Sequence, residues 1–141
     1  MKILLENSAN ILAQDGMGRY PIHIASRRGN LEAVRFLLTR DPSLVSVRDD
    51  QKFTPLHEAS KNALAKILSE LIDKAASAGP LPRPDAQPSL SFKIVDMQDD
   101  EGKTALHWCC WSDAIDCAKV IRDSNIAFYV YRACSCASEQ R

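Results

Sequence analysis

The sequence predicts an all-α repeat protein, because a short pattern centred on a histidine occurs three times with regular spacing. The three copies occupy residues 20–25, 54–59 and 104–109, which read YPIHIA, TPLHEA and TALHWC. His23 and His57 lie 34 residues apart, and His57 and His107 lie 50 apart, which is one further period plus an insertion of 16. A fixed period of roughly 20 to 50 residues identifies a repeat architecture before any helix is assigned.

Each copy of the pattern contains residues that start a helix. Thr54 and Thr104 can accept hydrogen bonds from the exposed amides at a helix start. Pro21 and Pro55 suit the first helical position, where a missing N–H has no consequence. A first helix is therefore expected to begin at each copy.

A second helix is expected in each unit. Gly29 follows His23 by six residues and can adopt the left-handed conformation that ends the first helix. Apolar residues at intervals of three and four then predict a helix with one buried face. They are Leu31, Val34, Leu37 and Leu38 in the first unit, Ile67, Leu68, Leu71 and Ile72 in the second, and Ile115, Ala118, Val120 and Ile121 in the third. An aspartate also precedes each histidine by eight residues, at Asp15, Asp49 and Asp99.

These residues resemble the ankyrin repeat, whose signature TPLHxA opens the first of two antiparallel helices. The resemblance implies a solenoid of helix-turn-helix units joined by β-hairpin-like loops. The expected organisation is a partial repeat or N-terminal cap at 1–14, repeats at 15–48, 49–98 and 99–125, and an unassigned C-terminal tail at 126–141. In this family the motif histidine is structural, tying the loop to the helix.

The second repeat departs from the pattern in three places. Lys52 stands where the other hairpin loops have Gly18 and Gly102, and Ala63 replaces the helix-ending glycine. A proline-rich insertion lies near 77–92 and holds four of the seven prolines, which predicts a solvated loop with polyproline II character. None of its prolines has the PxxP spacing of a docking peptide, so a passive loop is favoured. A hairpin strand is expected at 94–97.

Composition excludes several classes of partner. The 18 basic residues balance the 18 acidic ones, so neither nucleic acid nor a membrane surface is expected as a partner. The first apolar run is far too short for a secretion signal or a membrane span. Five cysteines without such a signal indicate reduced thiols and a location in the cytosol or the nucleus.

No catalytic or metal site is predicted, and no cofactor or small-molecule substrate is expected. Cys109, Cys110 and Cys117 with His107 could suggest zinc, but Cys109 replaces the motif alanine, which favours small buried thiols. Cys134 and Cys136 form half a ligand set in the tail. The sequence has no phosphate-binding glycine loop, nucleophile elbow or dinucleotide fingerprint.

The leading hypothesis is therefore a protein-protein interaction module that binds another protein through the concave face of the stack. The alternative is a non-catalytic accessory or regulatory segment of a larger enzyme. The family's contact positions correspond here to Met17, Arg19, Arg27 and Arg28 in the first repeat, to Asp50, Gln51, Phe53, Lys61 and Asn62 in the second, and to Asp100, Glu101, Lys103, Trp111 and Ser112 in the third. Phe53 and Trp111 are expected to be aromatic anchors, with Trp111 the stronger.

Overall fold

A computed structural model describes residues 9–77 and 94–123 as three pairs of helices. The first helices of the pairs are α2 (Pro21–Arg28), α4 (Pro55–Lys61) and α7 (Ala105–Trp111). The second helices are α3 (Leu31–Arg40), α5 (Ala65–Ser77) and α8 (Ile115–Asp123), and a short 3-10 helix η1 (Pro42–Ser46) follows α3. No strand is assigned within these two ranges, and the predicted all-α repeat protein is confirmed.

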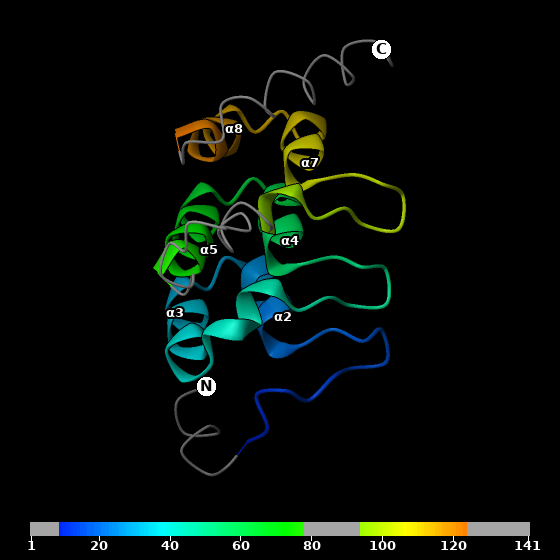
Figure 1. The fold of residues 1–141 in the computed structure, drawn as a ribbon, viewed down its shortest axis with the longest axis vertical. Coiled ribbons are helices and arrows are strands. Elements are labelled where there is room, and N and C mark those ends of the chain that lie inside the picture. The colour runs from blue at the N-terminus through cyan, green and yellow to red at the C-terminus, as the bar shows by residue number, and fades with distance from the viewer. Residues whose placement is uncertain (1–8, 78–93, 124–141) are drawn as a thin grey trace, which may run out of the picture.

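The helix pairs stack in chain order to form two columns (Figure 1). In one column α2 contacts α4 and α4 contacts α7, and in the other α3 contacts α5 and α5 contacts α8. Three loops, residues 15–19, 49–53 and 99–103, project from the α2, α4 and α7 side. We call them the hairpin loops, and we call the surface made by these loops and the exposed sides of α2, α4 and α7 the hairpin face.

The helix starts follow from the repeated motif. Pro21 and Pro55 are the first residues of α2 and α4, as predicted. Thr54 caps α4: its Oγ1 accepts the His57 backbone N–H at 3.4 Å, and its own N–H donates to Nδ1 of His57 at 3.2 Å. A side chain that satisfies an exposed amide in this way stabilises the first turn of a helix.

The inner sides of the second helices form a continuous core. Leu37, Leu71 and Ile121, which occupy one position of the repeat, are all fully buried. The prediction that Ile115 belongs to this buried face is wrong, because its side chain is 62 % exposed. Ile115 is the first residue of α8, and the buried side of that helix is made by Cys117 and Ile121, two and six residues further on. Two residues are about 200° around a helix, so the side chain of Ile115 points away from that buried side.

The strand expected at 94–97 is also wrong, because residues 94–96 are helical. Ile94 and Val95 are both buried, as are Leu44 and Val45 of η1 at the same place in the preceding repeat. Adjacent residues of a strand point to opposite faces, whereas one helical turn can bury two neighbours against the same core. This apolar pair therefore favours a turn of helix.

Backbone strain is concentrated in the repeats that lack glycine. Gly29 ends α2 with φ at 74°, as predicted, and Ala63 and Asp113 adopt φ values of 58° and 54° at the matching positions. Lys52 has φ at 60° in the second hairpin loop. A residue with a Cβ is disfavoured by about 1 kcal/mol in this conformation.

Replacing Ala63 with glycine is therefore expected to raise the free energy of unfolding by about 1 kcal/mol, because φ stays positive and the Cβ clash disappears. Urea denaturation followed by circular dichroism measures the change. Ala118→Gly, within α8, is the matched control and should lower stability by about 0.5 to 1 kcal/mol. Equal losses for both variants would show that the positive φ at Ala63 stores no strain.

Several predictions lie outside the described residues. These are the proline-rich insertion, the paired cysteines Cys134 and Cys136, the C-terminal tail, and most of the partial N-terminal repeat. The repeat boundaries proposed from the sequence remain a prediction.

Candidate functional site: the hairpin face

Each hairpin loop is held by the aspartate that recurs eight residues before the motif histidine. Asp49 Oδ1 accepts the backbone N–H groups of Gln51 at 3.0 Å and Phe53 at 2.8 Å. Asp15 and Asp99 accept the equivalent amides in the other two loops at 2.9 to 3.0 Å. The carboxylates thus fix the shape of loops whose outer side chains face solvent.

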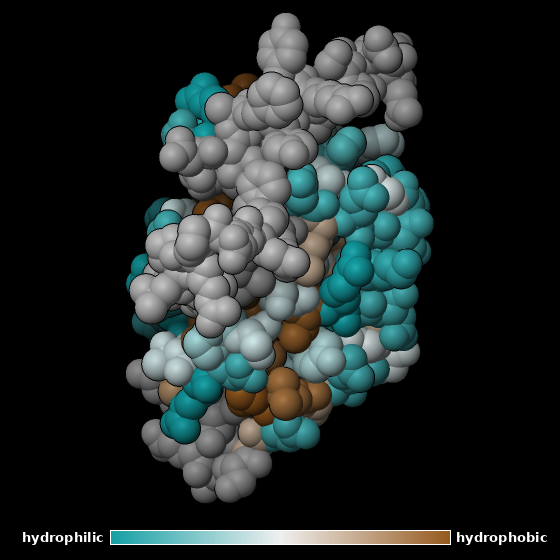
Figure 2. All heavy atoms as spheres, viewed as in Figure 1, coloured by the Kyte–Doolittle hydropathy of each residue, from teal (hydrophilic) through white to brown (hydrophobic). Residues whose placement is uncertain are grey.

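Backbone hydrogen bonds join each hairpin loop to the next. The Asp50 N–H donates to the Met17 carbonyl at 3.2 Å, and the Asp100 N–H donates to the Gln51 carbonyl at 3.1 Å. Hydrophilic residues gather over these loops at the right-hand side of the molecule (Figure 2). The hairpin face is therefore a continuous surface drawn from all three repeats.

The motif histidines connect the repeats, as their predicted structural role requires. Nδ1 of His23 accepts the Tyr20 N–H at 3.1 Å, which leaves Nε2 to donate to the Phe53 carbonyl 2.9 Å away. His57 makes the equivalent bond to the Lys103 carbonyl at 3.1 Å. Burial lowers the pKa of both His23 and His57, so both rings are neutral at pH 7. A neutral, fully bonded imidazole suits a structural link.

An aromatic cluster lies between the second and third hairpin loops. Trp108 packs against Phe53 with ring centroids 5.5 Å apart, and its indole N–H donates to Asp99 Oδ2 at 2.9 Å. The ammonium groups of Lys61 and Lys103 lie 5.0 and 4.9 Å from the Trp108 ring, within cation-π range. The cluster presents lysine charges that are held in place by aromatic rings.

Trp111 is the large apolar residue that this surface exposes most. Its side chain is 76 % exposed, as its position in the repeat predicted, and the Lys103 ammonium lies 5.5 Å from its ring. Lys103 also pairs with Glu101 in the third hairpin loop. The indole is thus oriented by its neighbours without being covered by them.

Phe53 is not the exposed aromatic anchor expected from the sequence, since it is only 7 % exposed. Its ring packs edge-on against His57 at 5.7 Å and against Trp108, and the Lys61 ammonium lies 5.4 Å from the ring centroid. The aromatic cluster explains this burial, because three rings cover more apolar surface together than apart.

A cleft of about 290 Å³ lies between the first two hairpin loops and helices α2 and α4. Met17, Arg19 and Asp50 contribute to its rim from the loops, and Arg27 and Lys61 from the helices. Glu58 also lines it. A cleft of this size has room for one or two side chains of a partner.

The stacked pairs, hairpin loops and linking histidines agree with the comparisons with known proteins. A family model described as "Ankyrin repeats (3 copies)" matches residues 1–80. The chain belongs to the ankyrin-repeat family. It is 30 % identical to inversin of Mus musculus over 125 residues, which is 87 % of this chain and 10 % of inversin. It is 32 % identical over 120 residues to neurogenic locus notch homolog protein 1 of Mus musculus, covering 85 % of this chain and 4 % of that protein.

Most contact residues that the ankyrin resemblance implied are exposed on this surface. Those exposed, besides Trp111, are Met17, Arg27, Arg28, Asp50, Gln51, Lys61, Asn62, Asp100 and Glu101. Arg19, Lys103 and Ser112 are partly buried and have partners within the protein. Arg19 pairs with Asp15 at 2.7 Å, and this guanidinium lowers the pKa of that carboxyl to about 2. The Ser112 hydroxyl donates to the Ser60 carbonyl at 3.1 Å, linking α7 to α4.

Sequence reasoning missed Glu58 and Trp108, which both directly follow the motif histidine. That position lies one helical turn before Lys61 and Trp111, so residues there share the face of the predicted contacts. The helical spacing was the signal that could have identified them.

Of the three cysteines in the described residues, Cys109 and Cys117 are small buried thiols and Cys110 is half-buried. Cys109 and Cys117 are buried, and burial raises the pKa of Cys109 to about 12, which keeps it protonated. Residues 9–77 and 94–123 contain no group of three histidine, cysteine or acidic side chains arranged to hold a metal ion. In the same ranges, no helix combines the length and apolar character that crossing a membrane requires.

Proposed function

We propose that this chain is a protein-protein interaction module that binds a partner protein through the hairpin face. In this proposal the stacked repeats form a solenoid whose hairpin face is the concave side, the usual recognition surface of such arrays. The module acts without catalysis, cofactor or small-molecule substrate, in the cytosol or the nucleus.

The exposure of Trp111 is the observation that carries the proposal. Trp111 is 76 % exposed, so the hairpin face presents a large apolar ring that a partner can cover. Tryptophan is also among the residues that contribute most to binding at protein interfaces. Lys103 beside the ring restricts it, so less side-chain freedom is lost on binding.

The charges of this surface support a protein partner more than nucleic acid or a membrane. Arg27 and Arg28 lie on the first repeat, whereas Asp100 and Glu101 lie on the third hairpin loop. A nucleic-acid site requires clustered positive charge to contact phosphates, and acidic residues among the cations oppose it. A mixed surface with an aromatic anchor fits a protein partner of complementary charge.

Trp111→Ala tests the proposal. A partner is first identified by affinity capture with cross-linking, and its dissociation constant is then measured by isothermal titration calorimetry. Loss of a buried indole is expected to weaken binding by about thirtyfold, the equivalent of about 2 kcal/mol. The melting temperature should stay nearly unchanged, because the ring is mostly exposed.

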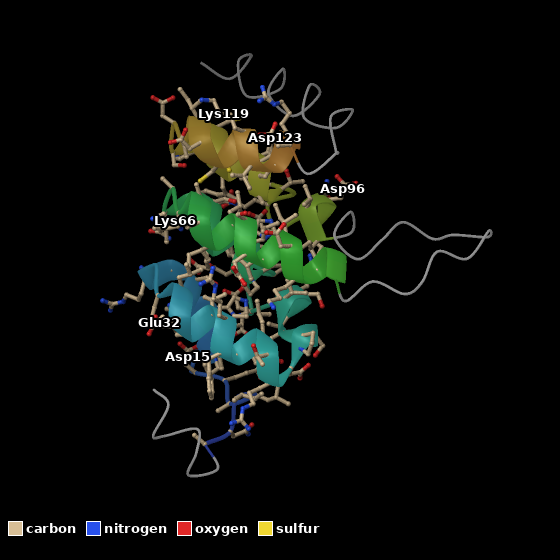
Figure 3. The ribbon with its side chains drawn as sticks, turned by 90° about the vertical axis from the view of Figure 1, so that its left-hand side faces the viewer. Asp15, Glu32, Lys66, Asp96, Lys119 and Asp123 are labelled. Atoms are coloured by element: carbon tan, nitrogen blue, oxygen red, sulfur yellow. The ribbon has the colours of Figure 1, made fainter. Side chains whose placement is uncertain are left out.

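The control lies on the column formed by the second helices, α3, α5 and α8. Lys66 on α5 is exposed on the side away from the hairpin loops (Figure 3), so Lys66→Ala should change neither affinity nor stability. If Trp111→Ala unfolds the chain, the indole packs within the fold, and its proposed role in binding a partner is wrong. If affinity and melting temperature both stay unchanged, the partner binds elsewhere.

A further inference from the structure

Glu58 is a nearly buried carboxylate without a partner. The residue is 8 % exposed, lies in the middle of α4, and lines the cleft between the first two repeats. Among the described residues, no hydrogen bond or ion pair involves its carboxylate. Most of the side chain is buried, but its oxygens are not shut off from solvent, so the carboxylate faces the cleft. A charge with so little contact with water is less stable than an exposed one unless another group compensates it.

The fold itself does not require an acid at this position. The equivalent residue is Ile24 in the first repeat and Trp108 in the third. Burial raises the pKa of Glu58, which means that the ionised form is disfavoured in the free protein. An unpaired carboxylate at a position where the other repeats have apolar residues, facing a cleft, is a candidate for binding a cationic group.

The cations around the cleft do not satisfy Glu58. Arg19 is engaged by Asp15, and the Lys61 ammonium lies over the rings of Phe53 and Trp108. Arg27 is exposed at the rim and acts on Glu58 only through its electrostatic field, without an ion pair. Both carboxylate oxygens thus remain available to a group that enters the cleft.

We propose that Glu58 receives an arginine side chain of the partner protein. This inference rests on the proposed function and specifies the chemistry of the partner. A guanidinium donates two parallel N–H groups, which match two unpaired carboxylate oxygens better than a single ammonium does. The cleft has room for one such side chain, and its opening between the hairpin loops leads onto the same face as Trp111.

An acidic partner is the competing reading, because Arg27 and Lys61 are also at the cleft. Such a partner would bring a carboxylate towards Glu58, leave it unpaired and repel it. It would also have to compete with the aromatic rings for Lys61. An arginine side chain would neutralise the charge of Glu58, whereas a carboxylate would add repulsion to a charge that is already unpaired.

The test uses small probes on the full chain labelled with ¹⁵N. N-acetyl-arginine methylamide is expected to shift the backbone amides of Gly16 and Asn62, which line the cleft. The uncharged isostere N-acetyl-citrulline methylamide should bind at least tenfold more weakly. Glu58→Gln should weaken binding of the arginine probe by at least tenfold, since the amide keeps the shape and loses the charge.

Two further variants separate the readings. Glu32→Gln removes the same charge from α3, in the column of second helices (Figure 3), and should leave probe binding unchanged. Arg27→Gln removes a cation from the rim and should strengthen binding of the arginine probe by about threefold. If an acidic group binds the cleft instead, Glu58→Gln should strengthen binding of the acidic probe N-acetyl-glutamate methylamide, and Arg27→Gln should weaken it.

The melting temperature of Glu58→Gln is expected to rise at pH 7.5, because a disfavoured buried charge is removed. The inference is overturned if the arginine probe causes no shifts, if the citrulline probe binds equally well, if Glu58→Gln binds like the parent chain, or if the acidic probe binds most tightly. Each of these results leaves the Trp111 experiment unaffected, so failure of the arginine site is distinguishable from failure of the proposed interaction surface.

Discussion

Truncating Leu71 to alanine is expected to lower the free energy of unfolding by about 2 to 5 kcal/mol. Leu71 is fully buried in α5, the second helix of the middle pair, which contacts both α3 and α8. Removing its side chain loses apolar burial and leaves a cavity between three helices that relax only partly. Urea denaturation followed by circular dichroism gives the change in midpoint and slope.

Ile115→Ala is the matched control, because it shortens an aliphatic side chain that is 62 % exposed on the neighbouring α8. It should change stability by less than about 0.5 kcal/mol. A loss below about 1 kcal/mol for Leu71→Ala, or equal losses for both variants, would contradict the assignment of Leu71 to the core. A reduced urea slope would show instead that the repeats no longer unfold together.

The repeat architecture could be predicted because the residues that determine it act locally. Proline at a helix start, threonine before it and glycine at a helix end each set the backbone within one turn. Gly29 and Thr54 therefore behave as predicted. Periodicity alone was less reliable at the ends of elements: it assigned Ile115 to the core and residues 94–97 to a strand, although the structure shows an exposed residue and a turn of helix.

The candidate site could be predicted only as a surface. Family positions identified which side chains face solvent, and Trp111 is exposed as expected. They did not reveal that Phe53 is buried by Trp108, because that contact joins two repeats across the insertion. Helical spacing could have placed Glu58 on this face, but not shown that its carboxylate lacks a partner. That depends on where Asp15 and the aromatic rings hold the neighbouring cations.

Acidification from pH 7.5 to 5.5 is expected to destabilise the protein through His23 and His57. Burial lowers the pKa of each ring below its usual value of 6.5, so the unfolded chain binds protons that the folded protein does not. Their stabilising contribution is complete above pH 6.5 and is lost as the pH falls towards the folded pKa. Each histidine contributes a slope of up to about 1.4 kcal/mol per pH unit in this window.

Charged neighbours moderate this loss without reversing it. Asp49 faces His23 and raises its pKa, whereas Asp99 raises and Arg48 lowers the pKa of His57, but burial is the largest effect on both rings. Glu58 acts in the opposite direction, because its raised pKa lets the folded protein bind a proton as the pH falls. An ordinary glutamate titrates near 4.5, so this effect is expected mainly at a lower pH than that of the histidines.

Urea midpoints measured at constant ionic strength between pH 7.5 and 5.5 test the expected loss of stability. Titration of the histidine rings by NMR then shows whether His23 and His57 cause it. His57→Gln should remove up to about 1.4 kcal/mol per pH unit from the slope, even though losing the link to Lys103 lowers stability at every pH. A stability that is flat between pH 7.5 and 5.5, or folded-state pKa values of 6.5 or above for both rings, would show that the histidine links do not depend on neutral imidazoles.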